Sequence, residues 1–99
     1  GTYGELKGGT LVKVSVGLAR ELLDPGAVLW EELGSKLPFE VCIGVNGYVW
    51  IHAARPAYTI LVQNAILNSE VLTEEQTRGM VRSLVKTVSR QMANEDDDQ

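Results

Sequence analysis

The sequence predicts an α+β domain in which helices cover one face of a three-stranded sheet, in the order β-α-α-β-β-α-α. An Asn-Gly pair at 46–47 separates two apolar runs, 39–43 and 48–53, which is the pattern of an antiparallel hairpin. Apolar residues recur with helical spacing before and after that hairpin, and one short strand precedes them. Strands and helices do not alternate singly along the chain, so a doubly wound sheet is excluded and the early strand must join the hairpin.

Before the hairpin, the spacing of the apolar residues changes twice along the chain. Residues 10–16 alternate imperfectly between apolar and polar side chains, which predicts a short strand. From 17 to 23 the apolar residues fall on one face of a helix. The Asp-Pro-Gly sequence at 24–26 ends that helix, because proline cannot continue it. A second short helix is then expected over 27–33.

The hairpin is the most strongly specified element. A type I′ turn needs positive φ at both central residues, and we expect that turn at Asn46 and Gly47. Gly44 lies two positions before the pair, where a glycine indicates a bulge or a close backbone approach rather than regular strand. The hairpin has a well-specified geometry and no catalytic residues, and this combination favours a docking role.

Two further helices are expected after the hairpin. Pro56 marks the boundary, because the residue before a proline disfavours helix, and 57–68 carries a broad apolar stripe. The residues expected to be buried there are Ile60, Leu61 and Ala65, with Ile66 or Leu67. Thr73 and Gln76 form a capping box that starts the last helix, which should run to about Met92.

The formal charge of −4 belongs to one end of the chain. Four acidic residues lie at 95–98, and the remaining residues include nine acidic and nine basic side chains. We expect residues 93–99 to form an acidic disordered tail and residues 9–92 to form the domain. Residues 1–8 are expected to be a linker or the end of a preceding domain of a longer protein. The apolar runs are far shorter than the about 20 residues of a membrane span, so no membrane partner is expected.

No group of side chains in the sequence indicates an enzyme or a metal centre. His52 is the only histidine, and no cluster of metal ligands accompanies it at suitable spacing. Cys42 has no partner for an internal disulfide, and its apolar neighbours predict a buried thiol. Trp30 and Trp50 should pack in a core or an interface, with stacking on a nucleic-acid base as the alternative. We therefore expect no catalysis, cofactor or metal, and a small hydrolase or metal enzyme is the least favoured class.

Three segments carry a family resemblance: KVSVGLARELL at 13–23 followed by Pro25, LPFEV at 37–41, and GVNGYVWI at 44–51. Together they resemble the KH-type domains of RNA exosome cap subunits, over about residues 9–92. The Gly-x-Asn-Gly motif, followed by an apolar residue and a tryptophan, is the most specific of these features. Tyr48 departs from the family pattern, which has an arginine there in many members. The predicted order of elements also matches a KH domain with an additional C-terminal helix.

The resemblance implies a non-catalytic role. Family members lie on top of a ring of subunits, hold it together and help guide RNA toward a 3′-to-5′ exoribonuclease. The implied partners are the ring subunits and an OB-fold domain that precedes residue 9 in the whole protein. The residues of the implied interface with that domain are Gly44, Asn46, Gly47 and Trp50. The implied location is the nucleus, the nucleolus and the cytoplasm.

The loop between the first two expected helices argues against ordinary RNA binding. A typical KH domain clamps the nucleic-acid backbone there with a Gly-x-x-Gly loop. This chain has Leu-Asp-Pro-Gly at 23–26, with no basic residue and with an aspartate that repels phosphate. We therefore expect RNA binding by this domain alone to be weak. The alternative function, a free-standing KH-type RNA-binding protein outside the exosome, is disfavoured for the same reason.

Basic residues recur at every fourth position of the last expected helix, as Arg78, Arg82, Lys86 and Arg90. This spacing keeps them within about 120° of the helix surface. Glu74 can compensate Arg78, but the other three have no acidic partner at suitable spacing in this helix. The row is interpreted as a solvated face opposite the apolar side of the helix. A contact to RNA or to an acidic partner surface is the alternative.

Overall fold

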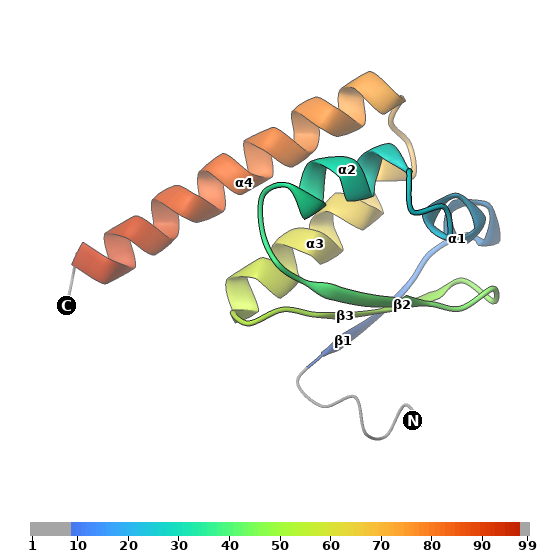
Figure 1. Cartoon of the computed structure of the whole chain (residues 1–99), viewed down its shortest axis with the longest axis horizontal. Coiled ribbons are helices and arrows are strands. Elements are labelled where there is room, and N and C mark those ends of the chain that lie inside the picture. Colours follow the sequence, from blue (N-terminus) through green and yellow to red (C-terminus); the bar gives the residue numbers. More distant parts are fainter. Residues whose placement is uncertain (1–8, 98–99) are drawn as a thin grey trace.

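The computed structural model describes residues 9–97, and within them it has one antiparallel sheet and four helices (Figure 1). The elements are β1 (Thr10–Lys13), α1 (Val16–Leu22), α2 (Val28–Gly34), β2 (Glu40–Ile43), β3 (Tyr48–His52), α3 (Pro56–Ser69) and α4 (Glu74–Asp97). β3 is the central strand and pairs with β1 on one side and β2 on the other. The predicted α+β class and the order of elements are confirmed.

The helices lie on one face of the sheet, as predicted (Figure 1). The register pairs Val12 with Val49 and Val41 with Ile51, so these apolar side chains share the face that the helices cover. They join apolar residues of α1, α2 and α3 in one core cluster. α4 lies on the side of α2 and α3 away from the sheet, and its Val81 is fully buried against that cluster. α4 is therefore attached to the domain mainly by its contacts with α2 and α3.

Side-chain caps define where two of the helices begin. Ser15 is the N-cap of α1, and its Oγ accepts a hydrogen bond from the backbone N–H of Leu18 at 3.1 Å. At the start of α4, the backbone N–H of Thr73 donates to Gln76 Oε1 at 3.0 Å, and the backbone N–H of Gln76 donates to Thr73 Oγ1 at 3.2 Å. This reciprocal pair is the predicted capping box, which is confirmed.

The buried face of α3 differs from the predicted one. Ile60 is 56% exposed, whereas Val62 is fully buried. The buried residues are Thr59, Leu61, Val62, Ala65 and Ile66. α3 contacts β3 on one side and both α2 and α4 on others, so its buried arc is set by three neighbours rather than by one apolar stripe. The prediction for Ile60 is therefore wrong, while those for Leu61 and Ala65 are confirmed.

α4 is longer than the sequence indicates. It runs to Asp97, so the predicted helix end near Met92 is wrong, and residues 98–99 of the predicted acidic tail lie outside the described part. Alanine and glutamate at 93 and 95 are good helix formers, and they extend the helix although acidic residues are unfavourable at a helix C-terminus. None of the helices between residues 9 and 97 has the length and hydrophobicity of a membrane span.

The hairpin is present, but its turn is not the predicted type I′ turn. Gly47 has a φ of +92°, and no residue other than glycine has a positive φ in the described chain, so Asn46 does not adopt the required conformation. The N–H of Gly47 donates to the Gly44 carbonyl at 3.1 Å, and the N–H of Gly44 donates to the Tyr48 carbonyl at 2.8 Å. These bonds define a three-residue loop, a type I turn followed by a left-handed glycine.

Gly47 is the position of this loop that requires glycine, and we expect Gly47→Ala to destabilise the domain by about 1–3 kcal/mol. The reason is twofold: the φ is positive, and a Cβ would lie 2.5 Å from the Val14 carbonyl oxygen. The matched control is Gly79→Ala in α4, where a Cβ meets nothing within 4 Å. The control should stabilise the domain by about 1 kcal/mol. Equilibrium urea unfolding measures both, and a Gly47→Ala variant as stable as the natural chain would contradict this account of the turn.

Candidate functional site

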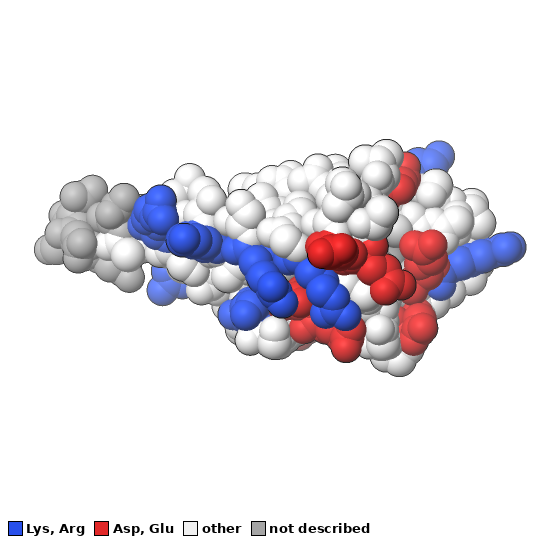
Figure 2. Space-filling view, turned by 90° about the horizontal axis from the view of Figure 1, so that it is seen from above, with Lys and Arg blue, Asp and Glu red and all other residues white. Residues whose placement is uncertain are grey.

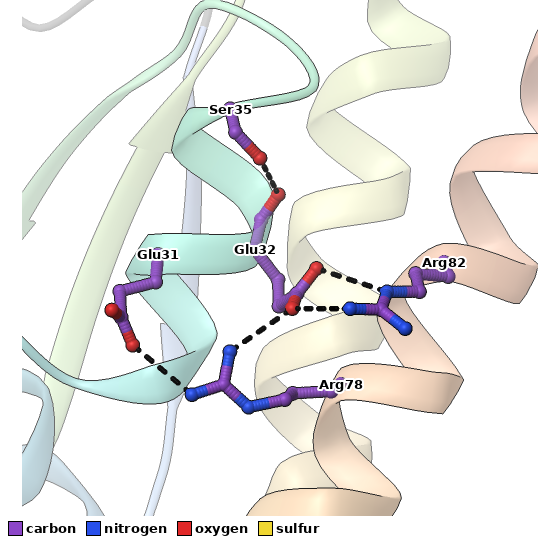
Figure 3. Close-up of polar contacts among 5 residues, drawn as sticks. All are labelled: Glu31, Glu32, Ser35, Arg78 and Arg82. Atoms are coloured by element: carbon purple, nitrogen blue, oxygen red, sulfur yellow. Dashed lines mark hydrogen bonds and ion pairs between the residues drawn. The ribbon is translucent and has the colours of Figure 1, made fainter.

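Two of the four predicted basic residues of α4 bind a carboxylate of α2 (Figure 3). Arg78 Nη1 donates to Glu32 Oε1 at 3.1 Å. Arg82 donates to the same carboxylate through Nη2 at 3.2 Å and through Nε at 3.4 Å. Arg78 also reaches Glu31 Oε2 at 3.3 Å through Nη2. We call Glu31, Glu32, Arg78 and Arg82 the α2–α4 clamp.

The geometry of the clamp follows from helix periodicity. Arg78 and Arg82 are four residues apart, so they lie on the same side of α4 and can reach one carboxylate together. The Glu32 side chain is only 8% exposed, so its charge requires the two guanidinium groups as partners. The Arg78 hydrogen bond, opposed by desolvation and helped by Arg82, holds the pKa of the Glu32 carboxyl below its ordinary value of 4.5. The same hydrogen bond raises the pKa of Arg78.

The clamp gives two residues of the basic row partners within the domain, while the row stays largely exposed, so its interpretation as a solvated face remains a prediction. Figure 2 shows basic side chains in a row along α4, with acidic side chains gathered beside the end of the row away from the C-terminus. Arg78 and Arg82 pair with carboxylates of α2, although their side chains are still 40% and 64% exposed. Lys86 and Arg90 are exposed and form no ion pair with a described side chain. These two residues are the part of the row that has no carboxylate partner among the described side chains.

The residues of the predicted interface motif lie in two parts of the hairpin: Gly44, Asn46 and Gly47 at its turn, and Trp50 in β3. Gly47 contacts its own domain, since its carbonyl accepts the N–H of Val14 at 2.7 Å and its Cα faces the Val14 carbonyl. Asn46 turns its side chain toward Gly44, where a Cβ would lie 2.6 Å from Asn46 Oδ1. The nearest backbone atom, the Tyr48 carbonyl oxygen, would lie 3.5 Å from that Cβ, so the close contact at Gly44 is with a side chain and not the expected close backbone approach. The positive φ of Gly47 and its contact with the Val14 backbone account for that glycine within the domain.

Trp50 lies on the face of the sheet opposite the helices. It pairs with Cys42 on one side and with Leu11 on the other. Its side chain is only 7% exposed, its ring stacks on His52 at 5.8 Å between centroids, and a Cβ on Gly9 would fall inside the indole ring. The indole Nε1 is buried and has no hydrogen-bond partner among the residues that the structure describes. A buried donor without an acceptor is unusual and marks this face as incomplete.

Cys42 and His52 do not form a reactive site. Cys42 is exposed, so the predicted buried thiol is wrong. Side chains alternate along β2, and Val41 and Ile43 take the covered face, which leaves Cys42 on the open one. His52 is half-buried beside Trp50, and the described residues contain no group of His, Cys, Asp or Glu side chains placed to hold a metal ion.

The loop between α1 and α2 is a turn that is stabilised by a hydrogen bond to its own aspartate side chain. Asp24 Oδ1 accepts the N–H of Gly26 at 2.9 Å, so the carboxylate occupies the centre of the loop. Beside it, Trp30 Nε1 donates to the Leu22 carbonyl at 2.7 Å. This loop offers a negative charge where a KH domain that binds RNA presents backbone amides to phosphate.

Sequence reasoning missed the acidic half of the clamp. Helix spacing relates the arginines only to partners in their own helix, whereas Glu32 is 46 residues from Arg78 and 50 from Arg82. One signal was available: two adjacent glutamates in the short helix 28–34, which has no basic residue. The apolar groove beside Trp30 was also missed, because its residues come from separate segments.

We expect Glu32→Gln to lower the melting temperature of the domain by several degrees at pH 7. We also expect the melting temperature of this variant to fall less between pH 7 and pH 3 than that of the natural chain. The pKa of Glu32 is depressed in the folded state, so the carboxylate stabilises the fold above the unfolded pKa, near 4.5. That stability is lost as the pH falls through the folded pKa, and the variant has no such group to titrate. Thermal unfolding by circular dichroism at pH 7 and pH 3 measures both effects.

Glu21→Gln is the matched control, because Glu21 is exposed in α1 and forms no ion pair with a described residue. Between pH 7 and pH 3, the melting temperature of Glu21→Gln should fall by the same amount as that of the natural chain. If Glu32→Gln behaves like Glu21→Gln, the clamp does not contribute to stability.

Comparison with known proteins agrees with this architecture. Residues 9–57 match the family model described as a KH domain. The chain is 36% identical over 85 residues to "Exosome complex component rrp40" of Schizosaccharomyces pombe, which covers 85% of this chain and 35% of that protein. It is 39% identical over 74 residues to "Putative exosome complex component rrp40" of Dictyostelium discoideum, which covers 75% of this chain and 31% of that protein.

A human protein shows a similar degree of identity. The chain is 32% identical over 79 residues to "Exosome complex component RRP40" of Homo sapiens, covering 80% of this chain and 29% of that protein. The chain thus spans about a third of the length of these curated relatives. The element order, the matched family model and these similarities agree with one another. The chain therefore belongs to the KH domains, in the group related to the exosome component RRP40.

Proposed function

We propose that this chain is the KH domain of a non-catalytic cap subunit of the RNA exosome. In this role it stabilises the ring of subunits and helps guide RNA into 3′-to-5′ processing and degradation, including rRNA maturation and RNA turnover. The observation that carries the proposal is the similarity to exosome complex components over most of the chain. The complex would act in the nucleus, the nucleolus and the cytoplasm.

The distribution of charge supports a structural role over tight RNA binding. Nonspecific affinity for RNA grows with the number of phosphates that a protein neutralises. Two arginines of α4 are held by Glu32, and the loop between α1 and α2 carries Asp24. Carboxylates therefore lie beside part of the basic row and in the loop where a KH domain contacts RNA. These contacts also weigh against the alternative of a free-standing KH-type RNA-binding protein.

The open face of the sheet supports an intramolecular interface. We propose that residues 1–8 lead from a preceding OB-fold domain, and that this domain docks near the motif residues Gly44, Asn46, Gly47 and Trp50. Trp50 supports this most directly, because its buried indole N–H needs an acceptor that residues 9–97 do not provide. Tyr48 and Leu11 are exposed on the same face and add apolar area for such contact.

Affinity capture of the whole protein from its source cells, followed by quantitative mass spectrometry, tests the cap role. We expect ring subunits and an associated exoribonuclease in amounts close to that of the captured protein. The control is the same capture with Trp50→Arg, which should lose part of the ring subunits because it places a charge in the proposed interface. Recovery of mRNA-binding proteins without a ring would contradict the cap role and favour the free-standing alternative.

Lys86 and Arg90 are the remaining candidates for contact with RNA on its path into the ring. We expect the double variant Lys86→Glu and Arg90→Glu, in the whole complex, to weaken RNA binding and to reduce the slope of log affinity against log salt by about 2. Arg20→Glu on α1 is the control and should leave that slope unchanged, because Arg20 lies outside the row. An unchanged slope in the double variant, with subunits lost instead, would assign the pair to an acidic partner surface.

A further inference from the structure

A groove of about 830 Å³ lies between α1, the loop that follows it, α2 and the turn from α3 to α4. No residue of β2 lines it, and its apolar lining comes mainly from leucines of the helical layer. Its charged lining residues are Arg20, Glu21, Asp24, Glu31, Glu74 and Arg78. We call it the acidic groove, because its lining has four carboxylates and two guanidinium groups.

The two arginines offset only part of this negative charge. Arg78 is already paired with Glu31 at 3.3 Å and with Glu32 at 3.1 Å. Arg20 forms no ion pair with a described side chain, and the same is true of three lining carboxylates, those of Glu21, Asp24 and Glu74. Acidic side chains accordingly gather near the start of α4 (Figure 2). A positively charged ligand is therefore the kind that this groove attracts.

Thr77 adds an unused hydrogen-bonding group to the lining. Its residue surface is only 5% exposed, and its backbone N–H donates to the Thr73 carbonyl at 2.8 Å. A threonine hydroxyl inside a helix can bond the carbonyl four residues before it, as Thr87 Oγ1 does with Ser83 at 3.0 Å. The Thr77 hydroxyl forms no such bond within residues 9–97, and its oxygen is not fully covered. It is therefore available to a ligand in the groove.

The spacing of the carboxylates decides which cation fits. A metal ion needs several oxygen ligands within about 2.6 Å. No three His, Cys, Asp or Glu side chains between residues 9 and 97 are grouped to hold one. The unpaired carboxylates come from α1, the loop after it and the start of α4, so several positive charges along a chain match them better than one ion does. RNA is disfavoured, because the same carboxylates repel its phosphates.

We propose that the acidic groove binds a segment of a protein partner that carries several lysine or arginine side chains. Their aliphatic stems pack against Leu72 and the leucines of α1 and α2, and their charged heads pair with the unpaired carboxylates. One head donates a hydrogen bond to the Thr77 hydroxyl. This site goes beyond the proposed cap role, because it rests on the groove alone and does not depend on the ring.

The test uses nitrogen-15 NMR of the complete 99-residue chain, titrated with a synthetic peptide of eight lysines. We expect saturable binding, with shifts of the amides of 18–29 and 72–78. A peptide of eight 2,4-diaminobutyrate residues has the same number of charges on shorter aliphatic stems. It should bind at least about fivefold more weakly, because its stems bury less apolar surface.

Two charge reversals form a matched pair of variants. Glu21→Lys lies in the groove lining, whereas Glu40→Lys is exposed on β2 outside it, and both change the net charge equally. Glu21→Lys should weaken octalysine binding by about fivefold more than Glu40→Lys does. Thr77→Val removes only the hydroxyl and should weaken binding by about threefold.

Equal weakening by Glu21→Lys and Glu40→Lys would overturn the proposal, because binding would then follow the net charge alone. Failure to saturate, equal binding of the two peptides, or shifts confined to the acidic residues at 95–98 would also overturn it. An eight-nucleotide oligouridylate that shifts the amides of the groove more strongly than octalysine does would identify an RNA site instead.

Discussion

The ion pairs around Glu32 are the interaction on which the arrangement of the helical layer depends. α4 has no extensive contact with the sheet, so its position is set by apolar contacts with α2 and α3 and by Arg78 and Arg82 on Glu32. The Glu32 side chain is nearly buried, so removal of both arginines would leave its carboxylate without a charged partner. The clamp also holds α2, which carries Trp30 and so fixes one wall of the apolar groove.

The same ion pairs determine which surfaces remain for partners. They pair two of the four residues of the basic row with carboxylates, and Asp24 gives the loop between α1 and α2 a negative charge, which supports the proposal that this domain alone binds RNA weakly. What it presents instead is apolar: the groove beside β2 and the open face around Trp50. A domain of this kind is suited to hold protein surfaces together, which agrees with its similarity to exosome components.

Local sequence patterns predicted the elements well, because periodicity, Pro56 and the Thr73–Gln76 capping box act over a few residues. They failed where distant segments decide the outcome. Ile60 is exposed because α3 is packed by three neighbours, and Cys42 is exposed because the pleat of β2 gives the covered face to Val41 and Ile43. The clamp could not be derived from spacing alone, since its partners lie on helices that only the tertiary fold brings together.

The most direct measurement of this account is the salt dependence of oligouridylate binding by the complete chain and by its Glu32→Gln variant, at a temperature where both are folded. If Glu32 withholds Arg78 and Arg82 from phosphate, the natural chain binds weakly with a shallow slope. The variant then binds more tightly, and its slope of log affinity against log salt is steeper by up to about 2. Equal affinities and equal slopes for the two proteins would contradict the account, because the arginines would then be as available with the carboxylate as without it.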